Sequence, residues 1–283
     1  MSAIDPKQYI EKQRQDWNRV ASAWEKWDQY LEENLSYISY RLIGDLRLRP
    51  GQDVLDLGCG TGNPSLLISR IVGDNGSVTG VDLSENMLSV ARKKADALGL
   101  SNVRFMAEDV TTLPFEKESF DAVISRFCLM FLPDIKQAMN EIVRVVRSGG
   151  YVAAAVWSTP DKNPFIRIAV EVLKQFTEVP SPVPGQPGIF RLSKPADLLN
   201  IMKDAGLTGV GDEEVTGESI FDSADEYLLN IKDMAAPLKP LFAKLSTEQA
   251  SEVDAKIKES VSKYKSGDKI LLPMAFRVVV GRK

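Results

Sequence analysis

The sequence predicts an α/β fold: a Rossmann-like, seven-stranded, mostly parallel sheet with helices on both faces and an added helical cap. Three observations lead to this prediction. Short apolar segments alternate with amphipathic segments of helical period between residues 53 and 157, which is typical of parallel sheets. A glycine-rich turn, Gly58–Gly62, follows the first apolar segment. The length of 283 residues and the 44% hydrophobic content fit one large domain with elaborations.

The N-terminal segment, residues 1–48, is expected to form a helical cap. Apolar side chains recur at helical spacing over Pro6–Tyr30, which predicts the first helix. A second helix is expected over Leu35–Leu46. Arg49-Pro50-Gly51 is a turn signal that ends the cap, so residues 49–283 are expected to form the main domain.

Strands and helices are expected to alternate through the first part of the main domain. The expected strands are Asp53–Leu57, Ser77–Val81, Val103–Ala107, Phe120–Ser125 and Tyr151–Trp157, and the expected helices are Pro64–Val72, Glu85–Leu98 and Ile135–Val146. Ser84 is placed to cap the second helix, and Gly99 lies just beyond its end.

Two insertions are expected beyond Trp157, at about residues 160–190 and 223–264. The first is predicted to contain a helix, Pro164–Thr177, and a loop rich in proline and glycine, Pro180–Gly188. The second is polar and mostly helical. The other expected elements are a helix at Lys194–Ala205, a strand region at Thr208–Glu218 and a final apolar strand within Lys269–Arg282.

Charge and hydropathy argue against two classes of partner. The net charge of −4 lacks the basic surplus with which nucleic-acid binders neutralise phosphates. The apolar runs are too short to span a bilayer. The N-terminal residues lack the pattern of a secretory signal, so a cytoplasmic location is expected.

The chemistry of the side chains excludes further classes. The sequence contains no histidine, which is the commonest general base and metal ligand. Hydrolases of the Ser-His-Asp and Cys-His types are therefore excluded. Cys59 and Cys128 are the only cysteines and are expected to be reduced thiols, so no metal site is expected.

The residues with the clearest chemical pattern surround the first predicted strand end. Asp56 lies in the strand, Gly58, Gly60 and Gly62 follow at every second position, and a helix starts at Asn63-Pro64. Glycine allows positive φ and close approach of the backbone to a ligand, and free N–H groups at a helix start attract anions. The pattern indicates a binding loop at the carboxyl edge of the sheet.

A second acid supports an adenosine ligand at this edge. Asp82 ends the next strand, where a carboxylate can accept hydrogen bonds from both ribose hydroxyls. A nicotinamide-binding loop usually reads G-x-G-x-x-G without a preceding acid. Here Asp56 would repel a pyrophosphate and attract an ammonium group, which favours an adenosine ligand that carries an amino-acid tail.

Residues Asp56–Gly62 resemble motif I of the class I S-adenosylmethionine-dependent methyltransferases. The resemblance covers about Arg49–Trp157 and is closest to the small-molecule branch of the ubiquinone/menaquinone-biosynthesis type. Further matches are Ala107–Val110, Phe120–Ser125 followed by Leu132-Pro133-Asp134, the turn Arg147–Gly150, and Phe276–Arg282 as the family's last antiparallel strand. Ser148 stands where the usual turn has proline, and both glycines remain.

The resemblance implies S-adenosyl-L-methionine as the cofactor and methyl transfer to a small-molecule acceptor by in-line displacement. It implies that Asp82 binds the ribose and Asp109 the adenine amino group. The full set of expected cofactor contacts is Asp56, Gly58, Cys59, Gly60, Gly62, Asp82, Leu83, Met87, Asp109, Val110, Ser125 and Arg126. Expected walls of the acceptor pocket are Trp24, Tyr30, Phe127, Phe131, Trp157 and Tyr227.

Several alternatives stay open from the sequence. The tryptophans of the first helix are also explained by packing, and Arg126 by a surface ion pair. The protein as a whole is also compatible with a non-catalytic adenosyl-ligand-binding protein and, less well, with an NAD-dependent oxidoreductase. Arsenic methylation is set aside because it relies on several cysteines. The sequence predicts neither the acceptor, nor a catalytic base, nor the oligomeric state.

Overall fold

The computed structural model describes residues 5–180, 183 and 185–283, and the strands of this part form a single mixed sheet. The main strand order is β3-β2-β1-β4-β5-β8-β6, and the short β7 pairs with β8 outside this path. The expected α/β fold with seven principal strands is therefore confirmed. Part of the expected loop Pro180–Gly188 and the first four residues of the cap lie outside the described residues.

Five strands form the parallel half of the sheet. They are β1 (Asp53–Leu57), β2 (Ser77–Asp82), β3 (Val103–Ala107), β4 (Phe120–Arg126) and β5 (Val146–Trp157). In the register, Leu57 of β1 lies beside Val81 of β2 and Ser125 of β4. The carboxyl ends of these three strands therefore meet at one edge of the sheet, which positions the site described below.

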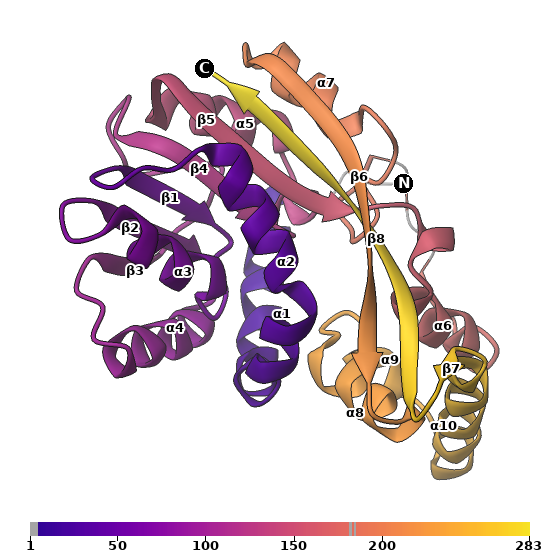
Figure 1. Cartoon of the computed structure of the whole chain (residues 1–283). Helices are drawn as coiled ribbons and strands as arrows, with labels where there is room; N and C mark the ends of the chain where they lie inside the picture. The colour runs from indigo at the N-terminus through magenta and orange to yellow at the C-terminus, as the bar shows by residue number, and fades with distance from the viewer. Residues whose placement is uncertain (1–4, 181–182, 184) are drawn as a thin grey trace.

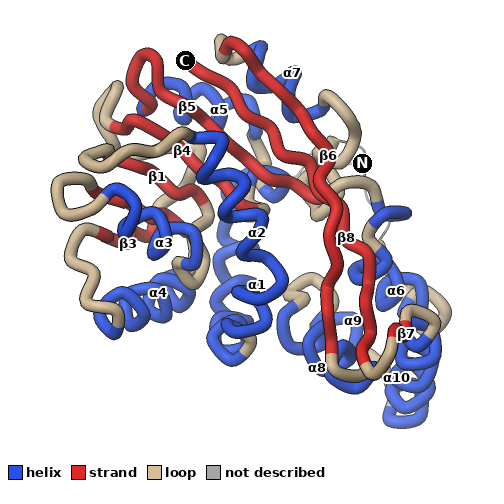
Figure 2. Tube along the Cα trace, in the orientation of Figure 1, coloured by secondary structure: helices blue, strands red, loops and turns tan. Residues whose placement is uncertain are grey.

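Helices cover both faces of this half (Figures 1 and 2). The helices α2 (Asp28–Leu46), α3 (Asn63–Val72) and α4 (Glu85–Ala97) lie on one face, and α5 (Ile135–Val145) and α7 (Asp197–Asp204) lie on the other. The buried stripe of α5, which includes Ala138, Met139 and Ile142, shows the i, i+3, i+4 spacing of an amphipathic helix.

The antiparallel half extends far beyond the parallel strands (Figure 1). Strands β6 (Thr208–Phe221) and β8 (Lys269–Arg282) pair over most of their length, and β8 also pairs with β5. At their far end lie α8 (Ala224–Met234), α9 (Lys239–Phe242), α10 (Thr247–Ser262) and β7 (Lys265–Ser266), with α6 (Pro164–Leu173) beside them.

The chain buries two separate large apolar clusters. The first lies between the sheet and its helices and includes Leu55, Val123 and Ile142. The second lies between the extended β6–β8 arm and helices α6, α8 and α10; Tyr227, Ile257 and Leu272 belong to it. The second cluster gives the residues inserted before β8 a core of their own.

The boundaries of several elements differ from the expectation. The cap helix was predicted to end at Tyr30, but α1 spans Pro6–Lys26 and α2 begins at Asp28. At the junction, Trp27 leaves helical geometry at φ −94° and ψ 17°. The backbone hydrogen bond from Leu31 to Trp27 continues across it, so the two helices meet at a bend rather than a loop.

Three further predicted boundaries were wrong. Strand β5 starts at Val146 rather than Tyr151, because the Ser148–Gly150 turn lies inside an irregular stretch of its pairing with β4. Helix α6 ends at Leu173 rather than Thr177. Strand β6 reaches Phe221 rather than Glu218 because the ladder to β8 continues to the pair Phe221–Ile270.

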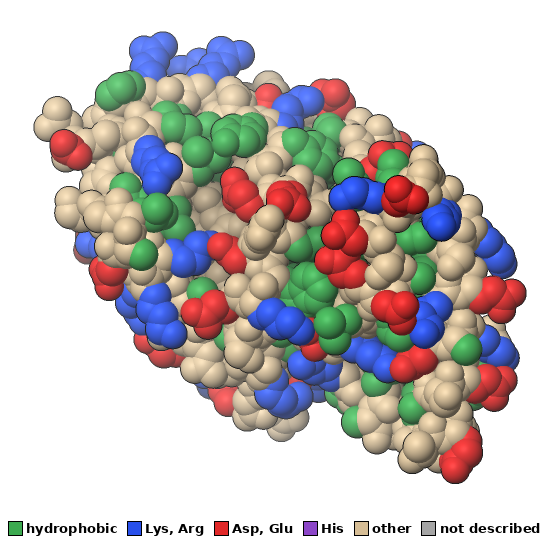
Figure 3. Space-filling view, turned by 60° about the horizontal axis from the view of Figure 1, so that its bottom comes forward, with side chains coloured by type: hydrophobic (Ala, Val, Ile, Leu, Met, Phe, Trp, Pro, Cys, Tyr) green, Lys and Arg blue, Asp and Glu red, His purple; other side chains and the backbone are tan. Residues whose placement is uncertain are grey.

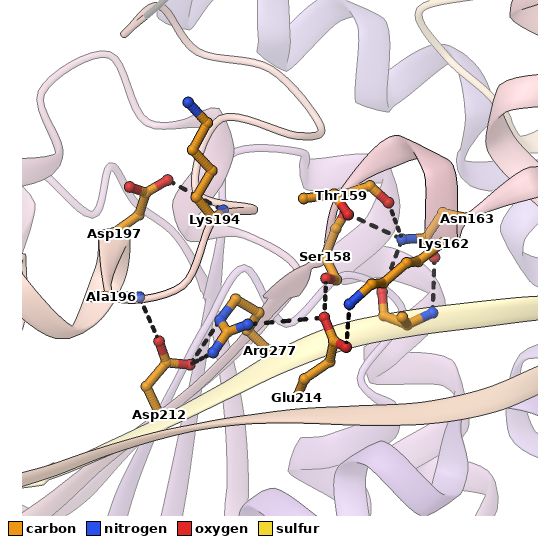
Figure 4. A network of polar contacts seen from close by, with 11 residues as sticks. Ser158, Thr159, Lys162, Asn163, Lys194, Ala196, Asp197, Asp212, Glu214 and Arg277 are labelled. Atoms are coloured by element: carbon orange, nitrogen blue, oxygen red, sulfur yellow. Dashed lines mark hydrogen bonds and ion pairs between the residues drawn. The ribbon is translucent and has the colours of Figure 1, made fainter.

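A polar network fastens the antiparallel strands to the end of β5 (Figure 4). The Arg277 guanidinium on β8 donates to Asp212 on β6 at 2.8 Å and forms an ion pair with it at 2.7 Å. Glu214 accepts from Ser158 and Lys162, both at 2.6 Å. Each charged side chain of this network thus has a partner, which is the condition under which a buried ion pair is tolerated.

The surface drawn in Figure 3 carries positive and negative side chains in alternation, with small apolar areas between them. Within the described residues, none of the helices combines the length and apolar composition that crossing a bilayer requires. The same residues contain no group of three or more His, Cys, Asp and Glu side chains placed to hold a metal ion.

Candidate functional site

A cavity lies where the carboxyl ends of β1, β2 and β4 meet the cap. It contains about 1060 Å³ of empty space, open solvent included. The sheet side contributes Gly58–Thr61, Pro64, Asp82, Leu83, Met87, Glu108–Val110, Arg126–Cys128 and Phe131–Pro133, and the cap contributes Tyr9, Ile10, Gln13, Trp17, Trp24 and Leu35.

The glycine loop has a backbone conformation that would strain residues other than glycine. Gly58, Gly60 and Gly62 have φ of 68°, 53° and 88°, in the left-handed region that glycine tolerates. A Cβ on Gly58 would lie 2.4 Å from that of Cys128. Gly58 N–H and Cys59 N–H donate to the Val81 carbonyl at 2.8 and 3.0 Å, which fastens the loop to β2.

Asp82 faces the cavity from the end of β2. Its carboxylate accepts hydrogen bonds from Gly60 N–H at 3.0 Å and Ser84 N–H at 2.9 Å. Burial raises the pKa of Asp82, and these backbone hydrogen bonds oppose the rise. Each carboxylate oxygen can accept a second hydrogen bond, so both ribose hydroxyls of an adenosine can still be bound there.

Asp56 lies beneath the loop rather than on the cavity wall. Its side chain is fully buried; Oδ2 accepts from the Ser65 hydroxyl at 2.6 Å, and Oδ1 has no partner among the described residues. Burial raises the pKa of Asp56 to about 6. An unpaired, fully buried carboxylate oxygen is costly, and a ligand donor that reached it would relieve that cost.

The end of β3 supplies two acids to the wall. Asp109 accepts from Thr111 N–H at 2.8 Å, which orients its carboxylate, and Glu108 and Val110 line the cavity beside it. Leu83 and Met87 complete this part of the wall. The nucleoside end of the expected ligand therefore has acids from β2 and β3 and apolar side chains around them.

The end of β4 carries the positive charge of the site. Arg126 lines the cavity and donates to the Ser39 hydroxyl of α2 at 2.9 Å. Burial lowers the pKa of Arg126, and Asp56 opposes that shift. The neighbouring Ser125 is buried and donates to the Leu57 carbonyl at 3.2 Å, so its side chain joins strands and does not line the cavity.

Three of the six expected acceptor-wall residues line the cavity, namely Trp24, Phe127 and Phe131. Trp157 stacks on Phe127, with ring centroids 4.3 Å apart and planes 4° from parallel, and so supports the wall without being part of it. The expectation for Tyr30 and Tyr227 needs correction. Tyr227 belongs to the second apolar cluster, and its hydroxyl donates to the Phe165 carbonyl at 2.7 Å; Tyr30 packs against both clusters.

Sequence reasoning missed most of the contribution of α1. Tyr9, Ile10, Gln13 and Trp17 line the cavity together with Trp24. Their spacing of three, four and seven residues places them on one helical face, so the signal was present in the sequence. Glu108, Cys128 and Leu35 were also missed; no local pattern distinguishes them from packing residues.

Helix α1 is held over the cavity by polar contacts on both sides. Asn18 accepts from the Ser84 hydroxyl of the α4 cap at 2.7 Å. On the other side, Asp233 of α8 accepts from the Trp27 indole N–H at 2.9 Å and from Lys26 at 2.7 Å. The cap therefore connects the start of α4, beside Asp82, with the inserted helix α8.

Comparison with known proteins agrees with the motifs. Residues 54–150 match the family described as a methyltransferase domain. The demethylmenaquinone methyltransferase of Bacillus cytotoxicus is 39% identical over 127 residues, which is 45% of this chain and 54% of that protein. The chain spans about half the length of the curated relatives it matches.

Solved structures share the fold. The YcgJ protein of Bacillus subtilis superposes with a TM-score of 0.59 at 19% identity, covering 88% of this chain and 98% of that one. Phosphoethanolamine N-methyltransferase 2 of Haemonchus contortus, solved with phosphomonomethylethanolamine and S-adenosylhomocysteine, gives 0.59 at 18% identity, covering 99% of this chain and 60% of that one. These likenesses concern the fold alone.

Proposed function

We propose that the protein is a class I S-adenosylmethionine-dependent methyltransferase of the menaquinone-biosynthesis type and that it methylates a small aromatic acceptor. The match of residues 54–150 to a methyltransferase domain and the 39% identity to a demethylmenaquinone methyltransferase support the proposal. The single observation that supports this best is the cavity itself. One side presents the glycine loop with Asp82 and Asp109, and the other presents aromatic rings of α1. Cofactor and acceptor would thus be enclosed together.

The cofactor supplies an electrophilic methyl group on a sulfonium, and its leaving group is a neutral thioether. The protein's task is therefore to align the two reactants and to exclude water. Asp82 and Asp109 would orient the nucleoside, while Trp17, Trp24 and Phe131 would cover the reacting end. Trp17 meets the other two rings edge-to-face at centroid distances of 5.8 and 5.7 Å, so this cover is closely packed.

An aromatic acceptor of the quinol type is the first candidate to test. The curated relative is named for demethylmenaquinone, and the apolar, aromatic wall suits a fused ring system. An amine or a lipid-like metabolite would fit the domain family equally well, but neither is favoured by a specific residue of the wall. The cytoplasmic location, the absence of a nucleic-acid partner and the individual site residues stay predictions.

The first experiment separates the proposed function from its rivals. Calorimetric titration of the purified chain with S-adenosylhomocysteine, with NAD as the control, should give micromolar binding of the first and none of the second. Transfer of labelled methyl from S-adenosylmethionine to a reduced, short-chain demethylmenaquinone is then measured at low cofactor concentration, with Asp82→Ala as the control of weakened cofactor binding. Binding without turnover on any aromatic acceptor would support the non-catalytic alternative; binding of NAD alone would support the oxidoreductase.

A further inference from the structure

Arg126 is a cation without an anionic partner in the wall of the cavity. The described residues contain no ion pair to its guanidinium, whose only hydrogen bond is to the neutral Ser39 hydroxyl. An arginine stays protonated under all ordinary conditions. A buried charge of this kind is normally paired. The site therefore lacks the negative group that would form a salt bridge with this guanidinium.

The residues around Arg126 indicate that the missing negative group would come from the methyl acceptor, on what we call the acceptor side of the cavity. We use this term for the wall formed by Trp17, Trp24, Leu35, Arg126, Phe127 and Phe131. Ser39, which holds the guanidinium, belongs to α2 of the cap, whereas the acids that suit the nucleoside come from β2 and β3. The other charged groups near Arg126 are Asp56 of β1 and Asp28 and Glu32 of α2, none of which lines the cavity.

None of the six residues of the acceptor side can take a proton near neutral pH, and the hydroxyl and thiol groups elsewhere in the cavity wall are no better suited. Burial raises the pKa of Tyr9 to about 12 and raises the pKa of the Cys59 and Cys128 thiols. All three are therefore protonated and are poor bases. An acceptor bound against the acceptor side, away from the carboxylates of β2 and β3, would therefore lose its proton to water, and Arg126 is the one charged group of that wall that would stabilise the resulting anion.

We propose that Arg126 binds an acidic oxygen of the methyl acceptor and holds it as an oxyanion during transfer, so that electrostatic stabilisation replaces a general base. This proposal rests on the proposed methyltransferase function and adds to it the chemical class of acceptor: an aromatic carrying an ionisable hydroxyl, rather than an amine. A protonated amine would meet the like charge of Arg126.

The step balances without a further reactant. The acceptor hydroxyl loses its proton to water, and the electron pair of the resulting oxyanion, on oxygen or delocalised onto a ring carbon, forms the bond to the methyl carbon. The carbon–sulfur bond breaks with its pair on sulfur, which gives neutral S-adenosylhomocysteine. If a ring carbon attacks, that carbon then loses its hydrogen as a proton and the oxygen regains one. One proton is released in either case.

The test measures binding first, so that it does not depend on turnover. Arg126→Met and Arg126→Lys are compared with Arg41→Met, which removes a partly exposed guanidinium of α2 that is paired with Asp45 and Glu213. Each protein is loaded with S-adenosylhomocysteine and titrated with 1-naphthol across pH, and the phenol–phenolate absorbance change reports the pKa of the bound probe.

We expect wild type and Arg41→Met to lower the pKa of bound 1-naphthol below that of the free probe. Arg126→Met should abolish the shift and weaken phenolate binding by roughly 10- to 100-fold, the scale of a lost hydrogen bond to a charged group. Arg126→Lys should retain part of the shift. An unchanged pKa of the probe in Arg126→Met would overturn the proposal.

A second arm distinguishes the acceptor from the carboxylate of the cofactor. S-Adenosylhomocysteine has an amino-acid tail, and 5′-methylthioadenosine has none. If Arg126 serves the acceptor, Arg126→Met should bind both compounds as wild type does. A selective loss of S-adenosylhomocysteine affinity would assign Arg126 to the cofactor instead and overturn the proposal. If the wild type bound neither S-adenosylhomocysteine nor 5′-methylthioadenosine, the proposed function itself would be refuted.

Discussion

Replacing Asp56 by asparagine should make the folded protein less sensitive to rising pH. Asp56 is fully buried, with one carboxylate oxygen unpaired, and its pKa is about 6 against an ordinary value of 3.8. Folded protein therefore keeps this proton at pH values where the unfolded chain has lost it. Because the unfolded state binds fewer protons in this window, stability falls as pH rises from about 4 to about 6.

The size of the effect follows from the shift. A difference of about two pKa units corresponds to roughly 3 kcal/mol. The wild type loses this much of its free energy of unfolding once the pH is above the pKa of Asp56 in the folded state. Asparagine keeps the shape and has no charge, but its amide can leave a donor unpaired at a pH-independent cost of about 1–3 kcal/mol. The absolute stability of the variant is therefore less informative than its change with pH.

The assay is urea unfolding of both proteins at pH 4 and pH 7.5, with Asp74→Asn, in the exposed turn after α3, as the matched control. Between these two conditions the free energy of unfolding of Asp56→Asn, relative to wild type, should rise by about 2 kcal/mol. The control should show no comparable change. A relative stability of Asp56→Asn that stays constant, or falls toward pH 7.5, would refute the reasoning.

Three further predictions concern the cofactor loop and the cap. Asp82→Ala should weaken S-adenosylhomocysteine binding by about 1–3 kcal/mol, because two ribose hydroxyls lose an acceptor; unchanged affinity in calorimetry would count against the ribose role. Gly58→Ala should destabilise the fold by about 2–4 kcal/mol, because the new Cβ would overlap Cys128. Gly60→Ala has open space around the new Cβ and should lose only the smaller free energy of the strained backbone. Equal denaturation midpoints for the two variants would contradict this prediction. Removing residues 1–26 should leave a cooperatively folding core and reduce S-adenosylhomocysteine affinity at least tenfold, because α1 buries only three of its residues while α2 buries eight; loss of cooperative unfolding would show that α1 belongs to the core.

The parallel half of the fold was predictable from local signals. Each strand from β1 to β4 is a short, mainly apolar segment bounded by polar residues or glycine, and helix α4 between β2 and β3 has a clear cap. Ser84 is an example, because its hydroxyl accepts from Met87 N–H at 3.1 Å, as its position before Glu85 suggested. Asp82 and Asp109 followed from their places at strand ends.

The remainder depends on contacts between distant segments. Tyr30 and Tyr227 look like any other aromatic residue of an amphipathic helix, and sequence periodicity does not say which of two apolar clusters will receive them. The length of β6 depends on its partner β8, since Glu218 and Ser219 have no strand signal of their own. The hydrogen bond from Arg126 of β4 to Ser39 of α2, in place of a salt bridge, is likewise visible only in the folded structure.

The pairing of β6 with β8 suggests that the helices inserted between these strands could be exchanged without disturbing the sheet. Everything between Phe221 and Ile270 leaves and rejoins the ladder at paired positions, whose Cα atoms in such sheets are about 5 Å apart. A short hairpin turn can bridge that gap. We therefore expect that the inserted helices can be replaced by those of a relative while the strands that carry Asp82 and Asp109 keep their register.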